Sequence, residues 1–350
     1  MIYYSGVCPI LAVPRVWGNR YLIHVDDIPL FGHIAFGVID RGTNVLQVRS
    51  TTICPFNCVY CSVDAGPYSA RRQSEFIVDA DWLVEWVRLA YKLKRGEVLE
   101  ALLDGVGEPA THPSLPKIVG ELKKIVPRVA LETRGFLLTK DLITRLWEAG
   151  LDRLNVSIDT LEDEKARYLT GVRWFNVGRV KEAVEYTVKE TGIDVMLTPV
   201  WIPGVNDEDV AEIVEWGLRI GVGKRFPGFG IQKYEVHKHG RKIPGVREPS
   251  WAEFYKFIRR LEEKYGVVLD YRKFDMGFRK ASRIPIIFGK NDIVELNVKL
   301  PGWLKNEVIA VDEENRVVVT IVGARDFSER RVKARIIGNE DGIYIARLVE

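Results

Sequence analysis

The sequence predicts an α/β protein in which a parallel α/β array is followed by a small all-β domain. From residue 44 onward, short β-rich runs alternate with amphipathic helical patterns, as in parallel sheets with crossover helices. After residue 289 the helical pattern stops and alternating strand-like runs replace it. The 350 residues leave room for two domains, and a composition of 47% hydrophobic and 28% charged residues excludes a disordered or collagen-like chain.

The array is built from repeated strand and helix units. A short run of β-branched and apolar residues predicts a strand, and apolar residues that recur every three or four positions predict a helix. Leu83, Trp86, Val87 and Ala90 follow the helical spacing, for example. The expected strands are 45–49, 101–107, 129–132, 153–158, 193–200, 230–235 and 267–271, and the expected helices are 80–95, one opened by Pro113, 177–190 and 251–265.

The last 60 residues predict a small β-barrel. Runs at 294–300, 316–322 and 332–337 alternate apolar and polar residues and are separated by turn signals. We therefore expect three parts: a β-rich N-terminal extension at 1–43, an α/β core at 44–289 and a C-terminal barrel at 290–350. No apolar run approaches the ~20 residues that cross a bilayer and no signal peptide is visible, so we expect no membrane partner and a cytoplasmic location.

The cysteines carry the strongest chemical signal. Three of the four, Cys54, Cys58 and Cys61, fall within eight residues after the first strand of the array. In an intracellular chain this clustering indicates metal binding or catalysis rather than disulfides. Three thiolates suit three irons of a [4Fe–4S] cluster and leave the fourth iron open. Zinc is the rival metal, although structural zinc sites use four ligands, and three unconnected buried thiols are the remaining alternative.

This C-x3-C-x2-C segment, with the aromatic Tyr60 before its last cysteine, resembles the radical S-adenosylmethionine (SAM) superfamily. The resemblance implies a partial (β/α)6 barrel and an enzyme that binds SAM at the open iron. It also implies that an electron from the cluster cleaves SAM and that the resulting 5′-deoxyadenosyl radical abstracts a hydrogen from the substrate. A ferredoxin or flavodoxin would donate the electron. An iron–sulfur electron carrier is the alternative that is not an enzyme.

Further segments resemble the SAM-binding elements of this superfamily, in the same order along residues 44–235. Gly105-Val106-Gly107-Glu108-Pro109 is similar to its Gly-Gly-Glu-Pro element, although Val106 departs from the pattern. Residues 149–159 are particularly similar to the molybdenum-cofactor cyclase branch. The resemblance implies that SAM is held by Tyr60 (through its backbone), Gly107, Glu108, Glu132, Ser157 and Ile202.

Several of these residues also have a structural alternative. Glu108 could cap the helix near Pro113, and Glu132 and Ser157 could be solvated polar residues at strand ends. The remaining cysteine, Cys8, could be a reactive thiol, although a small buried hydrophobic residue is the simpler role. With one cysteine left over, the chain cannot build the second cluster that the molybdenum-cofactor cyclase carries.

The positive charge of the chain is concentrated in one segment. Residues 224–290 carry 17 Lys and Arg against 7 Asp and Glu, whereas both flanks are slightly acidic. Basic residues interleaved with aromatic ones suit a polyanion, so an RNA nucleoside, tRNA foremost, is the expected substrate, and a solvated basic face is the alternative. The candidate substrate contacts are Lys233, His237, His239, Arg241 and Lys242.

The C-terminal strands bear some resemblance to the TRAM module, an OB-like RNA-binding barrel that is attached to certain radical SAM enzymes of RNA modification. Residues 292–298 and 332–337 carry this resemblance. It favours RNA as the substrate. A small phosphorylated metabolite or a protein side chain is the alternative substrate class.

Overall fold

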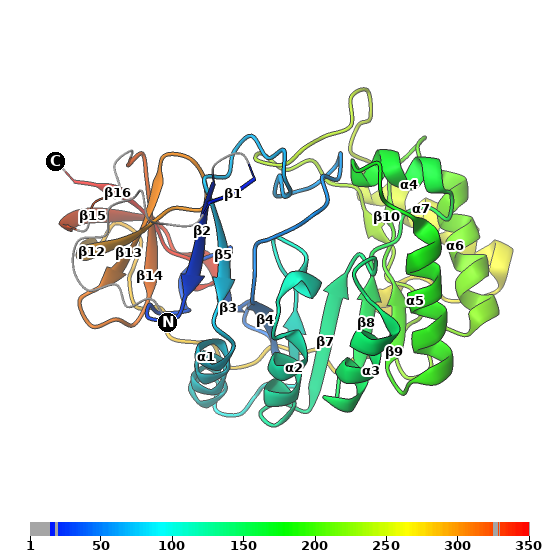
Figure 1. Cartoon of the computed structure of the whole chain (residues 1–350), viewed down its shortest axis with the longest axis horizontal. Coiled ribbons are helices and arrows are strands. Elements are labelled where there is room, and N and C mark those ends of the chain that lie inside the picture. The colour runs from blue at the N-terminus through cyan, green and yellow to red at the C-terminus, as the bar shows by residue number, and fades with distance from the viewer. Residues whose placement is uncertain (1–14, 18–19, 325–327, 329, 350) are drawn as a thin grey trace.

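The computed structural model describes residues 15–17, 20–324, 328 and 330–349, so Cys8 lies outside the described residues. A six-stranded sheet forms its centre (Figure 1). Strands β4 to β9 of this sheet are parallel, and β3 pairs antiparallel with β4. The strands in spatial order are β3 (Gly37–Asp40), β4 (Val45–Arg49), β6 (Glu100–Leu103), β7 (Arg128–Thr133), β8 (Arg153–Val156) and β9 (Asp194–Leu197).

The two faces of this sheet differ in burial. Side chains alternate between the faces along each strand. The outer face packs beneath helices, and Leu46, Leu103 and Leu131 on it are 0% exposed. The opposite, inner face carries polar side chains, several of which keep some exposure. The helices are α1 (Ala80–Leu93), α2 (Leu115–Lys123), α3 (Lys140–Glu148), α4 (Asp163–Thr170), α5 (Val177–Glu190), α6 (Asp207–Ile220) and α7 (Trp251–Tyr265).

The prediction of a sixth full strand at 230–235 is wrong. Only β11 (Gln232–Lys233) forms there, and it pairs with β10 (Val200–Trp201) in a separate two-stranded sheet. Pro199 separates β9 from β10 because proline has no N–H group for a sheet hydrogen bond. Next to β9, residues 228–230 hydrogen-bond to both sides of Leu197, so the open edge of the partial barrel is irregular.

Two smaller expectations also differ from the structure. Residues 267–271 form no strand, because the backbone N–H groups of Leu269 and Asp270 donate to the Glu262 carboxylate instead of to a neighbouring strand. Helix α2 begins at Leu115 with Pro116 in its first turn, two residues later than Pro113. The other expected strands and helices of the array are confirmed within a few residues.

A closed five-stranded barrel follows the α/β array, as expected. Its spatial order is β12-β13-β14-β16-β15, and β14 pairs parallel with β16 while the other pairs are antiparallel. The runs expected from the sequence correspond to β12, β14 and β15, whereas the strands β13 and β16 were not predicted. The strands are β12 (Ile293–Pro301), β13 (Glu307–Asp312), β14 (Val318–Val322), β15 (Arg331–Gly338) and β16 (Ile345–Leu348).

A three-stranded sheet lies between the central sheet and the barrel (Figure 1). It contains β1 (Arg15–Val16), β2 (Arg20–Val25) and β5 (Ser74–Val78), in that order. Strand β5 follows the cysteine loop directly. We use the name cysteine loop for residues 50–73, which connect β4 to β5. This loop therefore begins in one sheet and ends in another.

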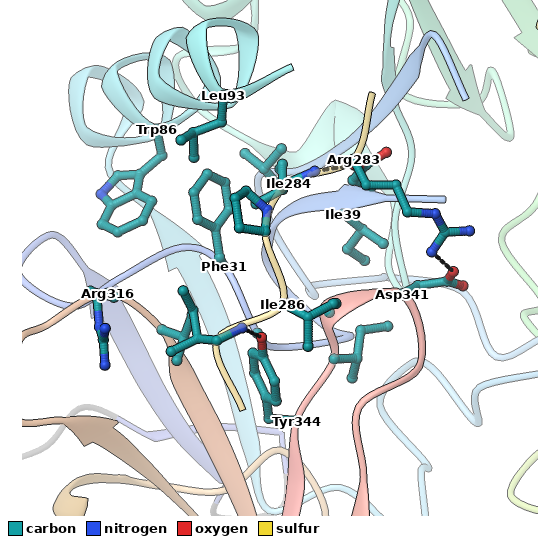
Figure 2. A pocket seen from close by; sticks show the side chains of 18 of the residues that line it. Phe31, Ile39, Trp86, Leu93, Arg283, Ile284, Ile286, Arg316, Asp341 and Tyr344 are labelled. Carbon is teal, nitrogen blue, oxygen red and sulfur yellow. Dashed lines mark hydrogen bonds and ion pairs between the residues drawn. The ribbon is translucent and has the colours of Figure 1, made fainter. Parts of the chain in front are cut away.

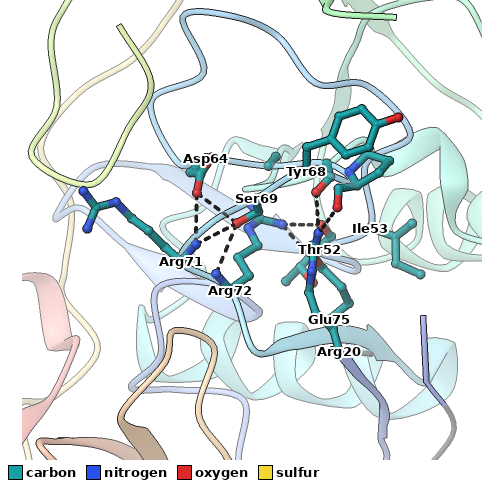
Figure 3. A network of polar contacts seen from close by, with 12 residues as sticks. Arg20, Thr52, Ile53, Asp64, Tyr68, Ser69, Arg71, Arg72 and Glu75 are labelled. Atoms are coloured by element: carbon teal, nitrogen blue, oxygen red, sulfur yellow. Dashed lines mark hydrogen bonds and ion pairs between the residues drawn. The ribbon is translucent and has the colours of Figure 1, made fainter. Parts of the chain in front are cut away.

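A buried ionic network joins the cysteine loop to β2 and β5 (Figure 3). Arg72 is fully buried, pairs with Glu75 at 3.0 Å, and donates to the carbonyls of Thr52 and Val106. Glu75 also accepts from Arg20 at 2.6 Å. The Arg72 guanidinium lies 4.9 Å from the ring centroid of Trp303, in the β12–β13 turn of the barrel. One cation thus contacts the cysteine loop, β5 and the barrel.

We expect Arg72→Met to lower the free energy of unfolding by roughly 3–5 kcal/mol, because the change leaves a buried carboxylate with one cation and several carbonyls without a donor. Denaturant unfolding followed by circular dichroism measures this loss. Arg88→Met is the matched control, since Arg88 pairs with Glu85 on the exposed surface of α1, and it should cost under about 1 kcal/mol. Similar small losses in both variants would contradict this account of the network.

Candidate active site

The cysteine loop places its three thiols at the carboxyl end of β4. Cys54 and Cys58 are buried, each 9% exposed, and Cys61 is partly exposed. The loop backbone is held from two directions. Asn57 and Val59 donate to the carbonyls of Thr170 and Leu169 at the end of α4, at 2.8 and 3.0 Å.

The loop that follows β6 also holds the backbone of the cysteine loop. The backbone N–H of Glu108 donates to the carbonyl of Ile53, at 2.8 Å. A Cβ atom on Gly107 would lie 2.4 Å from the carbonyl carbon of Thr52, whereas one on Gly105 would meet nothing closer than 3.3 Å. Gly107 therefore has a steric requirement that Gly105 lacks, because only glycine allows this close approach of two backbones.

The electrostatics of the thiols suit a cationic group between them. Burial raises the pKa of Cys54 well above its usual range, and the neighbouring Cys58 and Glu108 raise it further. Burial also raises the pKa of Cys58, against the opposing charge of Arg134. Thiolates in this loop therefore need positive charge beside them, which iron ions supply.

Three soft sulfur donors in one loop fit a [4Fe–4S] cluster. Within the described part of the chain, no three His, Cys, Asp or Glu side chains converge on one point as a single bound ion requires. A cluster needs no such convergence, because each thiolate binds a different iron. The donor set therefore fits the cluster that the sequence predicts.

Glu108 is buried and both of its carboxylate oxygens are used. One accepts from the backbone N–H of Ala110 at 3.1 Å, and the other from the backbone N–H of Arg134 at 2.8 Å. Glu108 caps a helix, as the structural alternative supposed. That helix is the short 3-10 helix Pro109–Thr111 and not α2. Burial raises its pKa. The residue joins the ends of β6 and β7 beside the cysteines.

Arg134 is a residue of this site that the sequence analysis missed. Its guanidinium pairs with Asp159 at 2.5 Å and donates to the hydroxyl of Tyr60, whose own O–H donates to Asp159. The Tyr60 ring therefore does more than pack, because its hydroxyl belongs to this buried triad. The sequence signal for Arg134 was its position: it is a basic residue at the end of β7, in a segment already matched to the superfamily.

Asp159 extends the triad toward the predicted SAM contacts. Its second oxygen accepts from the backbone N–H of Val200 at 2.9 Å. Asn206 donates to the Asp159 carbonyl and accepts from the backbone N–H of Ile202 at 2.7 Å. Ile202 itself is fully buried. Ser157 lies beside Arg134, which donates to its carbonyl at 3.3 Å.

A row of side chains on the inner face lies nearer to the amino ends of the strands than Glu108, Arg134 and Ser157 do. Pairing of β6 with β7 and of β7 with β8 puts Glu132 beside Asn155, and the next positions along β4 and β6 are Arg49 and Asp104. Arg49 binds Asp104 through two nitrogens, each at 3.2 Å. Burial and the charge of Asp104 raise the pKa of Glu132 to about 7.

The predicted substrate contacts divide into two groups. Lys233 is buried and pairs with Glu248 at 2.5 Å, and Arg241 binds Asn57 at 2.5 Å and Asp64 at 3.3 Å. These two cations therefore serve the scaffold. His237, His239 and Lys242 are exposed. No local pattern indicates this division, because the partners of Arg241 are more than 170 residues away.

The basic segment does not form one continuous surface. Residues 237–242 lie against the cysteine loop, where the backbone N–H of Arg241 donates to the carbonyl of Cys61 at 2.8 Å. Lys280 instead bridges to Thr43, which precedes β4. The cysteine loop follows β4, so the two parts of the segment lie at opposite ends of the strand.

A separate apolar cavity of about 310 Å³ lies between α1, β3 and the barrel (Figure 2). Phe31, Trp86 and Tyr344 line it, and Arg283 and Asp341 approach within 3.6 Å at its edge. None of the residues predicted to bind the cluster, SAM or the substrate lines this cavity. Among the described residues, no helix is long and apolar enough to cross a membrane.

Fold and site together define an α/β protein that presents three cysteine thiols at the carboxyl ends of its parallel strands. The Radical SAM superfamily model matches residues 48–217. An uncharacterized protein of Methanocaldococcus jannaschii is 32% identical over 353 residues, which cover 95% of this chain and 81% of that protein. The chain belongs to the radical SAM superfamily.

Characterised relatives share the core of the chain. The GTP 3′,8-cyclase of Rhizobium etli is 30% identical over 73% of this chain and 68% of its own length. The chain covers 57% of the GTP 3′,8-cyclase of Aquifex aeolicus, with 30% identity. Among solved structures, Streptococcus suis SuiB bound to the precursor peptide SuiA gives a TM-score of 0.49 at 18% identity, covering 65% of this chain and 46% of SuiB.

Membership in the superfamily confirms three predictions: the radical SAM resemblance, the enzymatic nature of the chain, and its cofactors, a [4Fe–4S] cluster and SAM. The structure confirms the α/β fold with a C-terminal barrel. The electron-carrier alternative is therefore set aside. The assignment of individual residues to these cofactors stays a prediction.

We expect Glu132 to make the stability of the protein depend on pH. Its pKa is about 7 in the folded chain, against an ordinary value of 4.5. The folded state thus keeps a proton that the unfolded state has lost, and stability falls as the pH rises from about 5 to about 8, by on the order of 2 kcal/mol. Glu132→Gln should remove this fall in denaturant unfolding at pH 5 and pH 8.

Glu148→Gln is the matched control, because Glu148 is exposed on α3. It should reproduce the pH dependence of the parent protein. A parent and a Glu132→Gln variant whose unfolding free energies change in parallel between the two pH values would contradict the assignment.

Proposed function

We propose that this enzyme cleaves SAM reductively and modifies an RNA nucleoside, tRNA foremost. Cys54, Cys58 and Cys61 bind the cluster. Gly107, Glu108, Ser157 and Ile202 hold SAM, together with Glu132 and the backbone of Tyr60. The observation that carries this proposal is the backbone hydrogen bond from Glu108 to Ile53, which joins the predicted SAM element to the cysteine loop.

Cys54, Cys58 and Cys61 would hold the cluster, which would supply the electron for the reductive cleavage of bound SAM. The residues of this chain position the reactants. Glu108 and Arg134 hold the ends of β6 and β7 together, and the Arg134–Asp159–Tyr60 triad joins the cysteine loop to β8 and β10. A cytoplasmic ferredoxin or flavodoxin is the proposed electron donor.

Two features of the structure support an RNA substrate. The barrel, which we propose to be TRAM-like, is fixed to the cysteine loop, because the Trp303 carbonyl accepts from the backbone of Gln73 at 3.0 Å. RNA on the barrel would therefore lie near the active site. Exposed Lys242 lies beside the cysteine loop and supplies positive charge for phosphates, and the exposed imidazole rings of His237 and His239 next to it offer hydrogen bonds to them.

A small phosphorylated metabolite is the second candidate substrate. The names of the relatives in Rhizobium etli and Aquifex aeolicus, GTP 3′,8-cyclases, favour it. Against it stands the cysteine count, since one cysteine outside the loop cannot hold a second cluster of the cyclase type.

Reductive SAM cleavage is tested by measuring 5′-deoxyadenosine after anaerobic cluster reconstitution and reduction with dithionite. We expect the parent protein to form it and Cys58→Ala to fall to the level without protein, with a matching loss of iron. Cys8→Ala is the matched control and should retain both signals. Undiminished 5′-deoxyadenosine formation by Cys58→Ala would remove the basis of the proposal.

RNA binding is tested by titrating tRNA across a salt series. Lys238 and Lys242 are exposed residues of the segment 237–242, which lies on the cysteine loop. Lys238→Ala combined with Lys242→Ala should weaken binding and reduce the slope of log affinity against log salt by roughly 1–2. Lys92→Ala combined with Lys256→Ala removes the same charge from exposed helix positions. Equal slopes for the two double variants would count against RNA at this surface.

A further inference from the structure

Two exposed aromatic side chains lie at the surface of the molecule beside the cysteine loop. Tyr68, in the loop, is 77% exposed, and Trp174, between α4 and α5, is 51% exposed. The backbone N–H of Tyr68 donates to the side chain of Asn57 at 3.3 Å. A Cβ atom on Gly171, three residues before Trp174, would lie 2.3 Å from the carbonyl oxygen of the same Asn57. Both aromatic residues are therefore tied to the middle of the cysteine loop.

Trp174 connects this surface to the segment that carries the thiols. Its ring centroid lies 5.7 Å from that of Phe56 and 5.1 Å from that of Phe136. Phe56 is 1% exposed and stands between Cys54 and Cys58 in the sequence. A partner that covers Trp174 therefore contacts a ring that packs directly on the cysteine loop.

Two arginines add positive charge to the same part of the surface. Arg173 and Arg179 are exposed, and neither forms an ion pair with any residue that the structure describes. The Arg179 guanidinium lies 4.6 Å from the ring centroid of Phe136, the ring that also packs on Trp174. Glu182, on the next turn of α5, is already paired with a lysine of α3. Cations without ion-pair partners thus lie beside an exposed tryptophan.

The position of this surface favours an electron donor over a substrate. A substrate must reach the inner face of the sheet, whereas α5, which carries Arg179, packs on the outer face against β9 (Figure 1). An electron needs no such access, because it passes through the wall of the barrel at the cysteine loop. Tryptophan, tyrosine and arginine are the residue types most enriched where proteins bind each other. The positive charge selects a partner with an acidic surface.

We propose that Tyr68, Arg173, Trp174 and Arg179 form the docking surface for an acidic flavodoxin that reduces the cluster. The anionic flavin hydroquinone gives up one electron and becomes the neutral semiquinone, the cluster accepts that electron, and no proton moves. Of the two proposed donors, a flavodoxin suits the exposed rings better, because a planar flavin packs on aromatic side chains. The inference rests on the proposed function, in which SAM cleavage needs an electron from another protein.

The test follows reduction of the cluster-loaded protein with SAM by its visible absorbance, with flavodoxin hydroquinone in one series and dithionite in the other. The flavodoxin rate of the parent protein should fall as salt rises, because salt screens the attraction between opposite charges. Arg173→Glu combined with Arg179→Glu should lower that rate by roughly tenfold or more at low salt. The dithionite rate should change little, since a small reductant needs no docking surface.

Lys92→Glu combined with Arg219→Glu is the matched control. Both residues are exposed near the C-terminal ends of α1 and α6, which lie at the amino ends of the strands and away from the cysteine loop. This variant should keep the flavodoxin rate of the parent. Trp174→Ala is a second test variant and should slow reduction by flavodoxin without reversing any charge. Binding of oxidised flavodoxin, measured by calorimetry, should weaken in both test variants and not in the control.

A flavodoxin rate that does not depend on salt in the parent protein overturns the proposal without any variant. Equal flavodoxin rates in the parent, the charge-reversed variant and the control also overturn it. Charge reversal at Arg173 and Arg179 that weakens tRNA binding and leaves the flavodoxin rate unchanged would assign the surface to RNA instead. Reduction by ferredoxin that depends on these arginines, while reduction by flavodoxin does not, would overturn the choice of partner.

The proposed function is tested separately by formation of 5′-deoxyadenosine with dithionite. A parent protein that forms this nucleoside with dithionite and is not reduced by flavodoxin contradicts the docking surface alone. A parent protein that is reduced by flavodoxin through this surface and forms no 5′-deoxyadenosine with either reductant contradicts the proposed function alone.

Discussion

A loop without regular secondary structure must hold three thiols in place, and this constraint shapes the rest of the molecule. Residues 50–73 contain no helix or strand beyond isolated bridges. Two arginines take the place of regular hydrogen bonding. Arg72 donates to carbonyls of Thr52 and Val106, and Arg241 donates to the Ala65 carbonyl and to Asn57. Each guanidinium can serve several acceptors at once, because its donors are fixed in a plane.

These two arginines also explain the position of the other parts of the chain. Arg72 is covered by Trp303 of the barrel, so the barrel shields the network from water as well as extending the surface. Arg241 brings residues 237–242 onto the loop, and Gly240 lies so close to the carbonyls of Cys61 and Ser62 that a Cβ would be 2.8 Å from each. The elements farthest from the cysteines in sequence thus complete the structure around them.

The sequence predicted those features that depend on local pattern. Strand and helix periodicity gave the array, because the outer face must be apolar at every second residue of a strand, as Leu103 and Leu131 are. It missed β13 and β16, and it assigned Lys233 and Arg241 to the substrate. Pairing of a charge with a distant residue leaves no local signal, and Arg241 contacts Asn57 across 184 positions. Arg134 was missed for the same reason, since its partners Asp159 and Tyr60 come from other elements.

The distribution of paired charge also limits how a substrate reaches the inner face. At the amino ends of the strands, Glu100 pairs with both Arg128 and Arg153, and the Phe226 ring lies 4.7 Å from Arg128 and 5.2 Å from Arg153. These paired charges occupy the inner face at the amino ends of the strands, and separating them would leave buried charges unpaired. A molecule that reaches the inner face therefore enters from the carboxyl ends of the strands, past the cysteine loop. Exposed His237, His239 and Lys242 lie at that same end, whereas the part of the basic segment near Thr43 lies at the opposite end.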